Sequence, residues 1–382
     1  MTKKPRKYLL ISPREPSGAT WLINCFLELG IKTYRRQDPD WMWQKQEDGS
    51  CVLNPEENIL RKWLPILSAE KVFLFKDDIE VQWTHEWPVK GYSSLPVIYF
   101  IRDPRDSIYS RYKRESPKIS FADFLDIPDA ATLLHKIDNW VLFNLYWLQR
   151  KNLKVFRFED YKNDANNTLN SILEYIKFVP DPDKFKKAID GSTSDKARES
   201  ENEYRKINNS DSQVINRAGA VSEWKKILDR EDKKVIDKIE IKSEKLLTYF
   251  GYEVRGLVSV EKDIVIYPNV SILPFFSQIE FSPEDVFQNE NKRSSTLSYL
   301  SVFTKTINKK WLNECGMLPF EIDILLNNLL VFFQLIQDKK KYDKILLLKS
   351  KHNQTEDKNS ITLNLKRYVH SVVKKIIKKI NP

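Results

Sequence analysis

The sequence has 382 residues, of which 41% are hydrophobic and 12% aromatic, enough to form the core of one large domain plus an extension. Of the net charge of +10, six charges come from the six Lys and Arg residues of segment 366–382, which contains no acidic residue. The rest of the chain is close to neutral. This excludes an extended nucleic-acid-binding surface but not a basic pocket for one small polyanion.

The three cysteines, Cys25, Cys51 and Cys315, are far apart in the sequence and form no CxxC pair. They therefore indicate neither a disulfide framework nor a zinc site, and no metal is implied. The apolar stretch after the basic N-terminus is about five residues long, too short for the hydrophobic region of a signal peptide. We expect a cytoplasmic protein in a reducing compartment.

Four short runs rich in β-branched and aromatic residues predict buried parallel strands. They are Tyr8–Ile11, Lys71–Phe75, Val97–Ile101 and Leu153–Phe158. Segments with helical periodicity lie between and after them: Gly18–Leu29, Pro104–Arg114, Ala131–Arg150, Asn166–Phe178 and Arg230–Phe250. This alternation predicts an α/β protein, a three-layer fold with a central parallel β-sheet flanked by helices.

The pattern changes after Gly256, where we place a boundary between a domain of residues 1–256 and a mostly helical C-terminal extension of residues 257–382. Within the extension, residues 258–266 have strand character. The tail, residues 361–382, has apolar residues at helical spacing and lysines between them, which predicts a basic amphipathic helix. Such a helix docks on the protein's own surface, on a partner or on a membrane surface.

The first predicted strand continues into segment Ser12–Trp21, and a predicted helix follows. At such a junction the first backbone N–H groups and the positive end of the helix dipole point outward. Gly18 allows the backbone to approach an anion, and Ser17 and Thr20 add hydroxyl groups. The segment lacks the Gly-Lys-Ser/Thr of a Walker A loop. It predicts a phosphate cradle, although an ordinary helix entry has the same pattern.

The third predicted strand ends at Arg102, at the edge of the sheet where ligands bind in open α/β folds. Ser110 follows eight residues later, on the next predicted helix. An arginine at a strand end and a hydroxyl on the adjacent helix can hold a phosphate from two sides. The same residues also fit a surface cluster of ion pairs.

Together these segments resemble the phosphate-binding motifs of sulfotransferases that use PAPS (3'-phosphoadenosine 5'-phosphosulfate), a P-loop-like domain. Pro16–Trp21 matches the second half of the family's 5'-phosphosulfate loop. Arg102–Asp106, followed by Ser110, matches its 3'-phosphate motif. Phe158–Tyr161 resembles the Tyr-Glu-Asp step after a core strand, and Arg217–Lys225 resembles the segment whose start closes over the 3'-phosphate.

The resemblance implies that PAPS is the co-substrate and that no metal takes part. It assigns the 5' side to Ser17, Gly18 and Thr20, the 3'-phosphate to Arg102, Ser110, Arg217 and Gly219, and the adenine to Trp21. Ala19, Phe158 and Ala218, which belong to the same motifs, complete the predicted nucleotide site.

Sulfuryl transfer to an alcohol needs a group that takes the hydroxyl proton, and histidine suits this role near neutral pH. His85 lies in segment Trp83–Pro88, seventeen residues before Arg102. It resembles the family's catalytic histidine, which follows Lys-Thr or Lys-Ser. We therefore predict His85 as the base; the alternative is a polar loop residue beside two tryptophans.

Two cations of the family's site have no counterpart at the matching positions. Pro16 stands where the family's loop has a lysine, and Trp83 stands where a second lysine precedes the histidine. Stabilisation of developing negative charge is usually the largest catalytic contribution. We therefore expect Arg14, two residues before Pro16, and Lys76, at the end of the second predicted strand, to replace the two lysines.

Two points remain open in the sequence. A second alignment places Lys76-Asp77-Asp78 at the Lys-Thr-His step, with Asp78 as the base, but it leaves His85 without a role. The family also has an aromatic residue on the far face of the adenine, after a Thr-Ser pair. Here Thr193-Ser194 is followed by Asp195, so this wall is open or is built differently.

We expect the protein to transfer a sulfuryl group from PAPS to a hydroxyl or amine of a small-molecule or glycan acceptor by direct in-line attack. The alternative is a catalytically impaired relative that binds PAPS or PAP (the product without the sulfuryl group) as a binding or regulatory module. A nucleotide-dependent phosphotransferase fits less well, because neither a Walker A loop nor an evident set of Mg²⁺-binding carboxylates is present. The sequence does not specify the acceptor.

Overall fold

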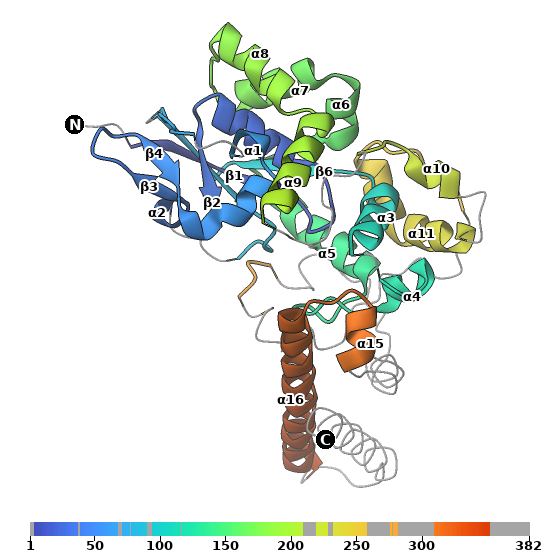
Figure 1. The fold of residues 1–382 in the computed structure, drawn as a ribbon. Helices are drawn as coiled ribbons and strands as arrows, with labels where there is room; N and C mark the ends of the chain where they lie inside the picture. The colour runs from blue at the N-terminus through green and yellow to red at the C-terminus, as the bar shows by residue number, and fades with distance from the viewer. Residues whose placement is uncertain are drawn as a thin grey trace. The chain divides into compact units, whose positions relative to one another are not determined.

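The computed structural model of the protein describes residues 4–36, 39–67, 71–76, 78–89, 94–115, 117–208, 219–227, 232–257, 276, 278–281 and 309–351 (Figure 1). The chain divides into two compact units. Unit 1 comprises Met1–Arg114 and Phe143–Arg255, and unit 2 comprises Glu115–Leu142 and Gly256–Pro382. Unit 2 thus combines an internal segment with the C-terminal extension.

A five-stranded sheet forms the centre of unit 1, with the strand order β2-β5-β1-β6-β7. The strands are β1 (Arg6–Ile11), β2 (Lys32–Arg35), β5 (Ile79–Thr84), β6 (Val97–Ile101) and β7 (Leu153–Arg157). All neighbours in this sheet are parallel, and Ile11 is paired with Thr84 on one side and with Tyr99 on the other. This register brings the carboxyl ends of β1, β5 and β6 to one edge.

Three of the four predicted strands are confirmed, at β1, β6 and β7. The run Lys71–Phe75 forms no strand; within it, Phe73 alone makes an isolated bridge, to Cys51. The strand that enters the sheet is β5, where the polar residues Glu80 and Gln82 alternate with buried apolar ones. The continuous apolar run was therefore misleading: Val72 and Leu74, which give it its apolar character, are exposed.

Helices cover both faces of the sheet, which confirms the three-layer α/β fold. The main helices of unit 1 are α1 (Ala19–Glu28), α3 (Pro104–Glu115), α6 (Phe158–Asn163), α7 (Ala165–Tyr175), α8 (Pro182–Gly191), α9 (Ser194–Ile207), α10 (Glu223–Ile227) and α11 (Lys233–Tyr249). Ile98 and Phe100 of β6 belong to the core cluster that includes residues of α1 and α7. Tyr99, between them, points to the opposite face and donates to Asn144 of α5 (Lys136–Leu148) at 2.7 Å.

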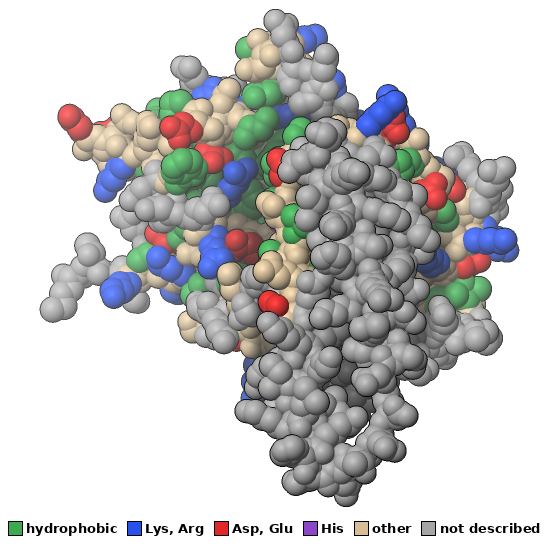
Figure 2. All heavy atoms as spheres, turned by 90° about the horizontal axis from the view of Figure 1, so that it is seen from below, with side chains coloured by type: hydrophobic (Ala, Val, Ile, Leu, Met, Phe, Trp, Pro, Cys, Tyr) green, Lys and Arg blue, Asp and Glu red, His purple; other side chains and the backbone are tan. Residues whose placement is uncertain are grey.

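Shorter elements complete unit 1. They are helix α2 (Pro39–Met42), the antiparallel pair β3 (Trp43–Lys45) and β4 (Cys51–Leu53), and the 3-10 helices η1 (Pro55–Lys62) and η2 (Pro65–Leu67). On the face of the molecule shown in Figure 2, basic and acidic side chains of the described residues are interspersed.

In unit 2, the internal segment packs against the C-terminal helices α15 (Lys309–Glu314) and α16 (Pro319–Lys351). Lys118 N, just before α4 (Phe121–Asp126), donates to Glu314 O at 2.7 Å, and Asn328 Nδ2 donates to Ala130 O at 2.9 Å. Among the helices that the structure describes, none is both long and apolar enough to cross a membrane. The predicted strand region 258–266 and the amphipathic tail 361–382 lie outside the described residues.

Arg105 holds the turn after β6 against the last helices of unit 1. Its guanidinium donates to Asp103 at 2.7 Å, to Glu240 of α11 at 2.8 Å and to Glu253 O at 2.8 Å, and it lies 3.8 Å from the ring centroid of Trp224. The side chains of Arg105, Asp103 and Glu240 are all buried. All three guanidinium nitrogens are thus satisfied by protein acceptors, so this arginine of the motif supports the fold.

Replacing Arg105 by Met should lower the free energy of unfolding by about 3–5 kcal/mol, because it leaves buried carboxylates without their partner. Urea unfolding followed by circular dichroism measures this loss. The control is Lys196→Met, which removes an ion pair with Glu199 whose two side chains are both exposed and should change stability little. Similar losses in the two variants would contradict the structural role of Arg105.

Candidate active site

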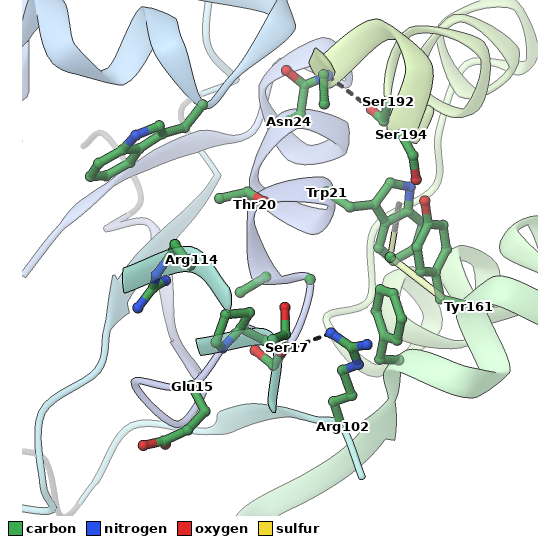
Figure 3. A pocket seen from close by; sticks show the side chains of 18 of the residues that line it. Glu15, Ser17, Thr20, Trp21, Asn24, Arg102, Arg114, Tyr161, Ser192 and Ser194 are labelled. Atoms are coloured by element: carbon green, nitrogen blue, oxygen red, sulfur yellow. Dashed lines mark hydrogen bonds between the residues drawn. The ribbon is translucent and has the colours of Figure 1, made fainter. Parts of the chain in front are cut away.

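A pocket lies at the carboxyl edge of the sheet, around the loop that joins β1 to α1 (Figure 3). Of the fourteen residues predicted for the site, eleven line this pocket: Arg14, Ser17, Gly18, Ala19, Thr20, Trp21, His85, Arg102, Ser110, Phe158 and Gly219. Arg217 and Ala218 lie outside the described residues. The parallel register explains the convergence, because each strand delivers its C-terminal loop to the same edge.

Lys76 does not join the pocket, and neither does Asp78. Both precede β5, and the direction of this parallel strand places them at its amino end, away from the pocket edge. The Lys76 ammonium lies 4.4 Å from the ring centroid of Phe178, and the Asp78 carboxylate pairs with Arg6, the first residue of β1, at 3.1 Å. The expectation for Lys76 depended on a strand at 71–75 that does not form.

Gly18 shapes the loop at the start of α1. Its φ of 83° lies in the left-handed region, and a Cβ atom there would come within 2.4 Å of the Phe158 ring. The same ring lies near Gly219, whose φ is 56° and whose Cβ would be 3.4 Å from it. Both the backbone conformation and the available space therefore require glycine at position 18.

A buried ion pair fixes this loop to α3. Glu15 Oε1 accepts from Arg111 Nη1 at 2.9 Å, and both side chains are buried. In Figure 3 the Glu15 carboxylate is directed away from Ser17 and Arg102. The neighbouring Arg14 is exposed and also lines the pocket.

Arg102 reaches the pocket from the end of β6 with one donor unsatisfied. Its Nη2 donates to Ala220 O at 2.8 Å and its Nη1 to Pro16 O at 3.4 Å, while the guanidinium carbon lies 4.8 Å from the Phe158 ring centroid. Its Nε is buried and has no hydrogen-bond partner. A buried, charged donor without an acceptor is costly, and an anionic ligand would remove that cost.

Two buried carboxylates hold the neighbouring backbone in place. Asp106 accepts from Ser222 N and Trp224 N, both at 2.8 Å, so the segment that follows Gly219 is tied to α3. Burial raises the pKa of Asp106 to about 7, although the charge of Arg102 acts in the opposite direction. Glu159 likewise accepts from Asp103 N at 3.1 Å, and burial raises the pKa of its carboxyl group.

His85 directly follows β5 and contacts the residue that follows β1. Its Nδ1 lies 3.1 Å from both Ser12 O and Ser12 Oγ. The carbonyl oxygen can only accept, so its hydrogen bond forms with the tautomer that has the proton on Nδ1, whereas the Ser12 hydroxyl can donate to an unprotonated Nδ1. We adopt the tautomer with the proton on Nδ1. The other ring nitrogen, Nε2, is then the atom that can take a proton.

The surroundings of His85 favour its neutral form. Burial of the ring lowers its pKa from the ordinary value of 6.5; hydrogen bonding to Ser12 raises it, and the charges of Arg114, Arg14 and Arg35 lower it further. The residue as a whole is exposed to solvent, which weakens each of these effects but leaves the direction of the shift unchanged. The ring of His85 is therefore mostly unprotonated at neutral pH.

Several pocket residues were not predicted from the sequence. They are Asn24, Trp63, Pro65, Arg114, Tyr161, Ser192 and Ala197. Trp21 stacks on Tyr161 with ring centroids 3.8 Å apart. Arg114 could have been found, because it lies one helical turn beyond Ser110 on the same face. Nothing in the sequence indicated Trp63, because it directly follows the 3-10 helix η1, which contains no recognisable motif.

Asn24 joins three parts of the pocket wall. Its side-chain Nδ2 donates to Ser192 Oγ at 2.8 Å, and its Oδ1 accepts from Ile66 N at 3.0 Å. This buried amide ties α1 to the end of α8 and to η2.

Among the described residues, no three His, Cys, Asp or Glu side chains lie together as a metal site would require.

Comparisons with known proteins give a consistent result. Residues 92–246 match the family model described as sulfotransferase domain. Sulfotransferase 2A6 of Mus musculus is 25% identical over 256 residues, which cover 60% of this chain and 82% of the relative.

Two solved structures show lower sequence similarity. Mouse sulfotransferase SULT7A1 complexed with PAP is 15% identical, with a TM-score of 0.41 over 64% of this chain and 84% of that chain. Retinol dehydratase in complex with androsterone and the inactive cofactor PAP is 17% identical, with a TM-score of 0.42 over 70% and 84%.

Gly18→Ala should destabilise the protein by about 1–3 kcal/mol, because it adds backbone strain and forces the Phe158 ring to move. Gly49→Ala is a matched control: its φ is 84°, but nothing lies within 4 Å of the added Cβ. Urea unfolding of the two variants separates the strain from the steric clash. Equal losses would show that Phe158 gives way without cost.

Proposed function

The chain belongs to the sulfotransferase family, and we propose that it binds PAPS and transfers the sulfuryl group to a hydroxyl or amine of a small-molecule or glycan acceptor. The observation that carries this proposal is Arg102, a charged residue of the pocket whose buried Nε lacks an acceptor. A 3'-phosphate would satisfy this donor by a charge-assisted hydrogen bond.

We place the two phosphate ends of the nucleotide at two sides of the loop. The 5' side lies at the N-terminus of α1, where Ser17 and Thr20 line the pocket and backbone N–H groups are available. The 3'-phosphate lies against Arg102, Ser110 and Gly219, which line the same pocket. The stacked Trp21 and Tyr161 rings provide an aromatic surface for the adenine.

In the proposed reaction, the acceptor oxygen attacks the sulfur of PAPS in line with the bond to the 5'-phosphate. The new S–O bond forms as the bridging S–O bond breaks, and the electron pair of that bond remains on the phosphate of PAP. The acceptor's proton passes to Nε2 of His85, while Nδ1–H stays on Ser12 O. The products are the sulfated acceptor and PAP.

The negative charge that develops on the bridging oxygen needs a nearby cation. Pro16 cannot supply one, so we propose Arg14 for this role. Arg14 lines the pocket, and its charge reaches the ring of His85. A guanidinium stays charged throughout, so Arg14 would stabilise the leaving group without protonating it.

The absence of the usual loop lysine favours a second candidate, a module that binds PAPS or PAP without turnover. It requires the same nucleotide site but no productive base. Transfer of labelled sulfate from PAPS to a panel of phenols and glycans distinguishes the two functions.

Arg102→Ala should weaken PAP binding about 10- to 100-fold, since a hydrogen bond to a charged group contributes about 1.5–3 kcal/mol. Binding of 5'-AMP, which lacks the 3'-phosphate, should change much less. Isothermal titration calorimetry with both nucleotides measures this difference, and Arg6→Ala, at the opposite edge of the sheet, is the control. No binding of PAP to the unmodified protein would refute the proposed function, and equal losses for both nucleotides would make Arg102 structural.

His85→Ala should lower turnover about 10²- to 10⁴-fold and leave PAP affinity nearly unchanged. In the unmodified protein, protonation of Nε2 removes the base, so kcat/KM should fall as the pH drops through the lowered pKa of His85, below its ordinary value of 6.5. Rates between pH 5 and 8 with an acceptor from the panel test this. An acid limb above pH 7, or one that persists in His85→Ala, would assign the base elsewhere.

A further inference from the structure

A third arginine, Arg114, lines the pocket beside Arg14 and Arg102 and has no counterpart in the motifs. Arg114 lies on α3 four residues after Ser110, so both side chains are on one face of this helix, separated by one turn. Both line the pocket. Helix α3 begins just after Arg102, which belongs to the proposed 3'-phosphate site. Arg114 lies near the other end of the helix, about 6 Å along its axis beyond Ser110.

The effect on His85 indicates which end of the pocket Arg114 occupies. Of the three arginines that disfavour a proton on the His85 ring, Arg114 acts most strongly. Figure 3 shows Arg114 and Arg102 on opposite sides of Ser17. Arg114 therefore lies on the side of Ser17 away from the proposed 3'-phosphate site, in the pocket that His85 also lines.

Several other charged residues near His85 form ion pairs. Arg35 of β2 pairs with Glu57 at 3.3 Å and lies over the Trp83 ring, and the neighbouring Arg36 pairs with Glu86, which follows His85. In the loop, Glu15 is paired with Arg111. Arg14 and Arg114 are the arginines of the pocket lining other than Arg102.

We propose that Arg114 is a catalytic residue, which binds the equatorial oxygens of the sulfuryl group as it passes from PAPS to the acceptor. This inference depends on the proposed function. A guanidinium suits the task because its planar set of donors holds two oxygens at once and stays charged. In this arrangement Arg14 stabilises the leaving oxygen and Arg114 stabilises the transferred group. The two arginines thus take the place of the two lysines that are missing from the loop and from the segment before His85.

The same position gives Arg114 a second effect that a purely structural residue would not have. Burial is the largest cause of the lowered pKa of His85, and the charge of Arg114 lowers it further, so removal of this charge should slow the chemical step and also raise the pKa of His85. The two effects have separate readouts, a rate and an NMR titration of the ring. With four histidines in the chain, the His85 signal is assigned by comparison with His85→Ala.

The test uses Arg114→Gln and Arg114→Lys in the full chain, with an uncharged phenol as the acceptor. Arg114→Gln should lower kcat about 10²- to 10³-fold, with acceptor KM and PAP affinity within about threefold of the unmodified protein, and the His85 pKa should rise. Arg114→Lys should recover part of kcat and restore the pKa. Lys113→Gln, an exposed neighbour that does not line the pocket, is the matched control and should change none of these quantities.

Inorganic sulfate provides a readout that does not depend on turnover. In the protein saturated with PAP, sulfate can occupy the place of the transferred group, and its binding is followed through the His85 ring signal. Arg114→Gln should weaken this binding at least tenfold, and Lys113→Gln should not. If kcat and sulfate binding are both unchanged in Arg114→Gln, or if the loss is confined to acceptor KM, the inference is overturned. If the unmodified protein binds no PAP, the proposed function itself fails, which is a separate result.

Discussion

The parallel pairing of β1 with β5 is the constraint on which the site depends. The register that places Ile11 beside Thr84 also places the next residues, Ser12 and His85, within hydrogen-bond distance. A shift of one residue in this register would turn the side chains of β5 to the other face of the sheet and remove that contact. The same edge receives Arg102 from β6, so one sheet brings His85 and Arg102 to the same pocket.

Around this edge, buried carboxylates hold the backbone segments that border the pocket. The Glu15–Arg111 pair holds the loop, and Asp106 holds the segment after Gly219. Such pairs add little net stability compared with apolar packing, but breaking one is costly. They give a rigid pocket in which donors are placed before the ligand arrives, which is what stabilisation of a transition state requires.

The sequence predicted those pocket residues that belong to short local motifs better than those that tertiary packing brings to the pocket. Loop residues such as Gly18, and the strand end at Arg102, were placed correctly because a strand, a turn and a helix follow one another within a few residues. Lys76 was misplaced because β5 alternates polar and apolar residues, whereas the preceding apolar run is partly exposed. Trp63 was missed because only tertiary packing brings it to the pocket. Arg114 was missed because it belongs to no motif, although its spacing from Ser110 places both on one face of α3.

A crystal structure of the complex with PAP tests the central claim most directly. The account predicts the 3'-phosphate about 3 Å from Arg102 Nε and the Ser110 hydroxyl, and the 5'-phosphate at the N-terminus of α1 beside Ser17 and Thr20. A nucleotide bound elsewhere, or a complex in which Arg102 Nε still has no acceptor, would contradict it.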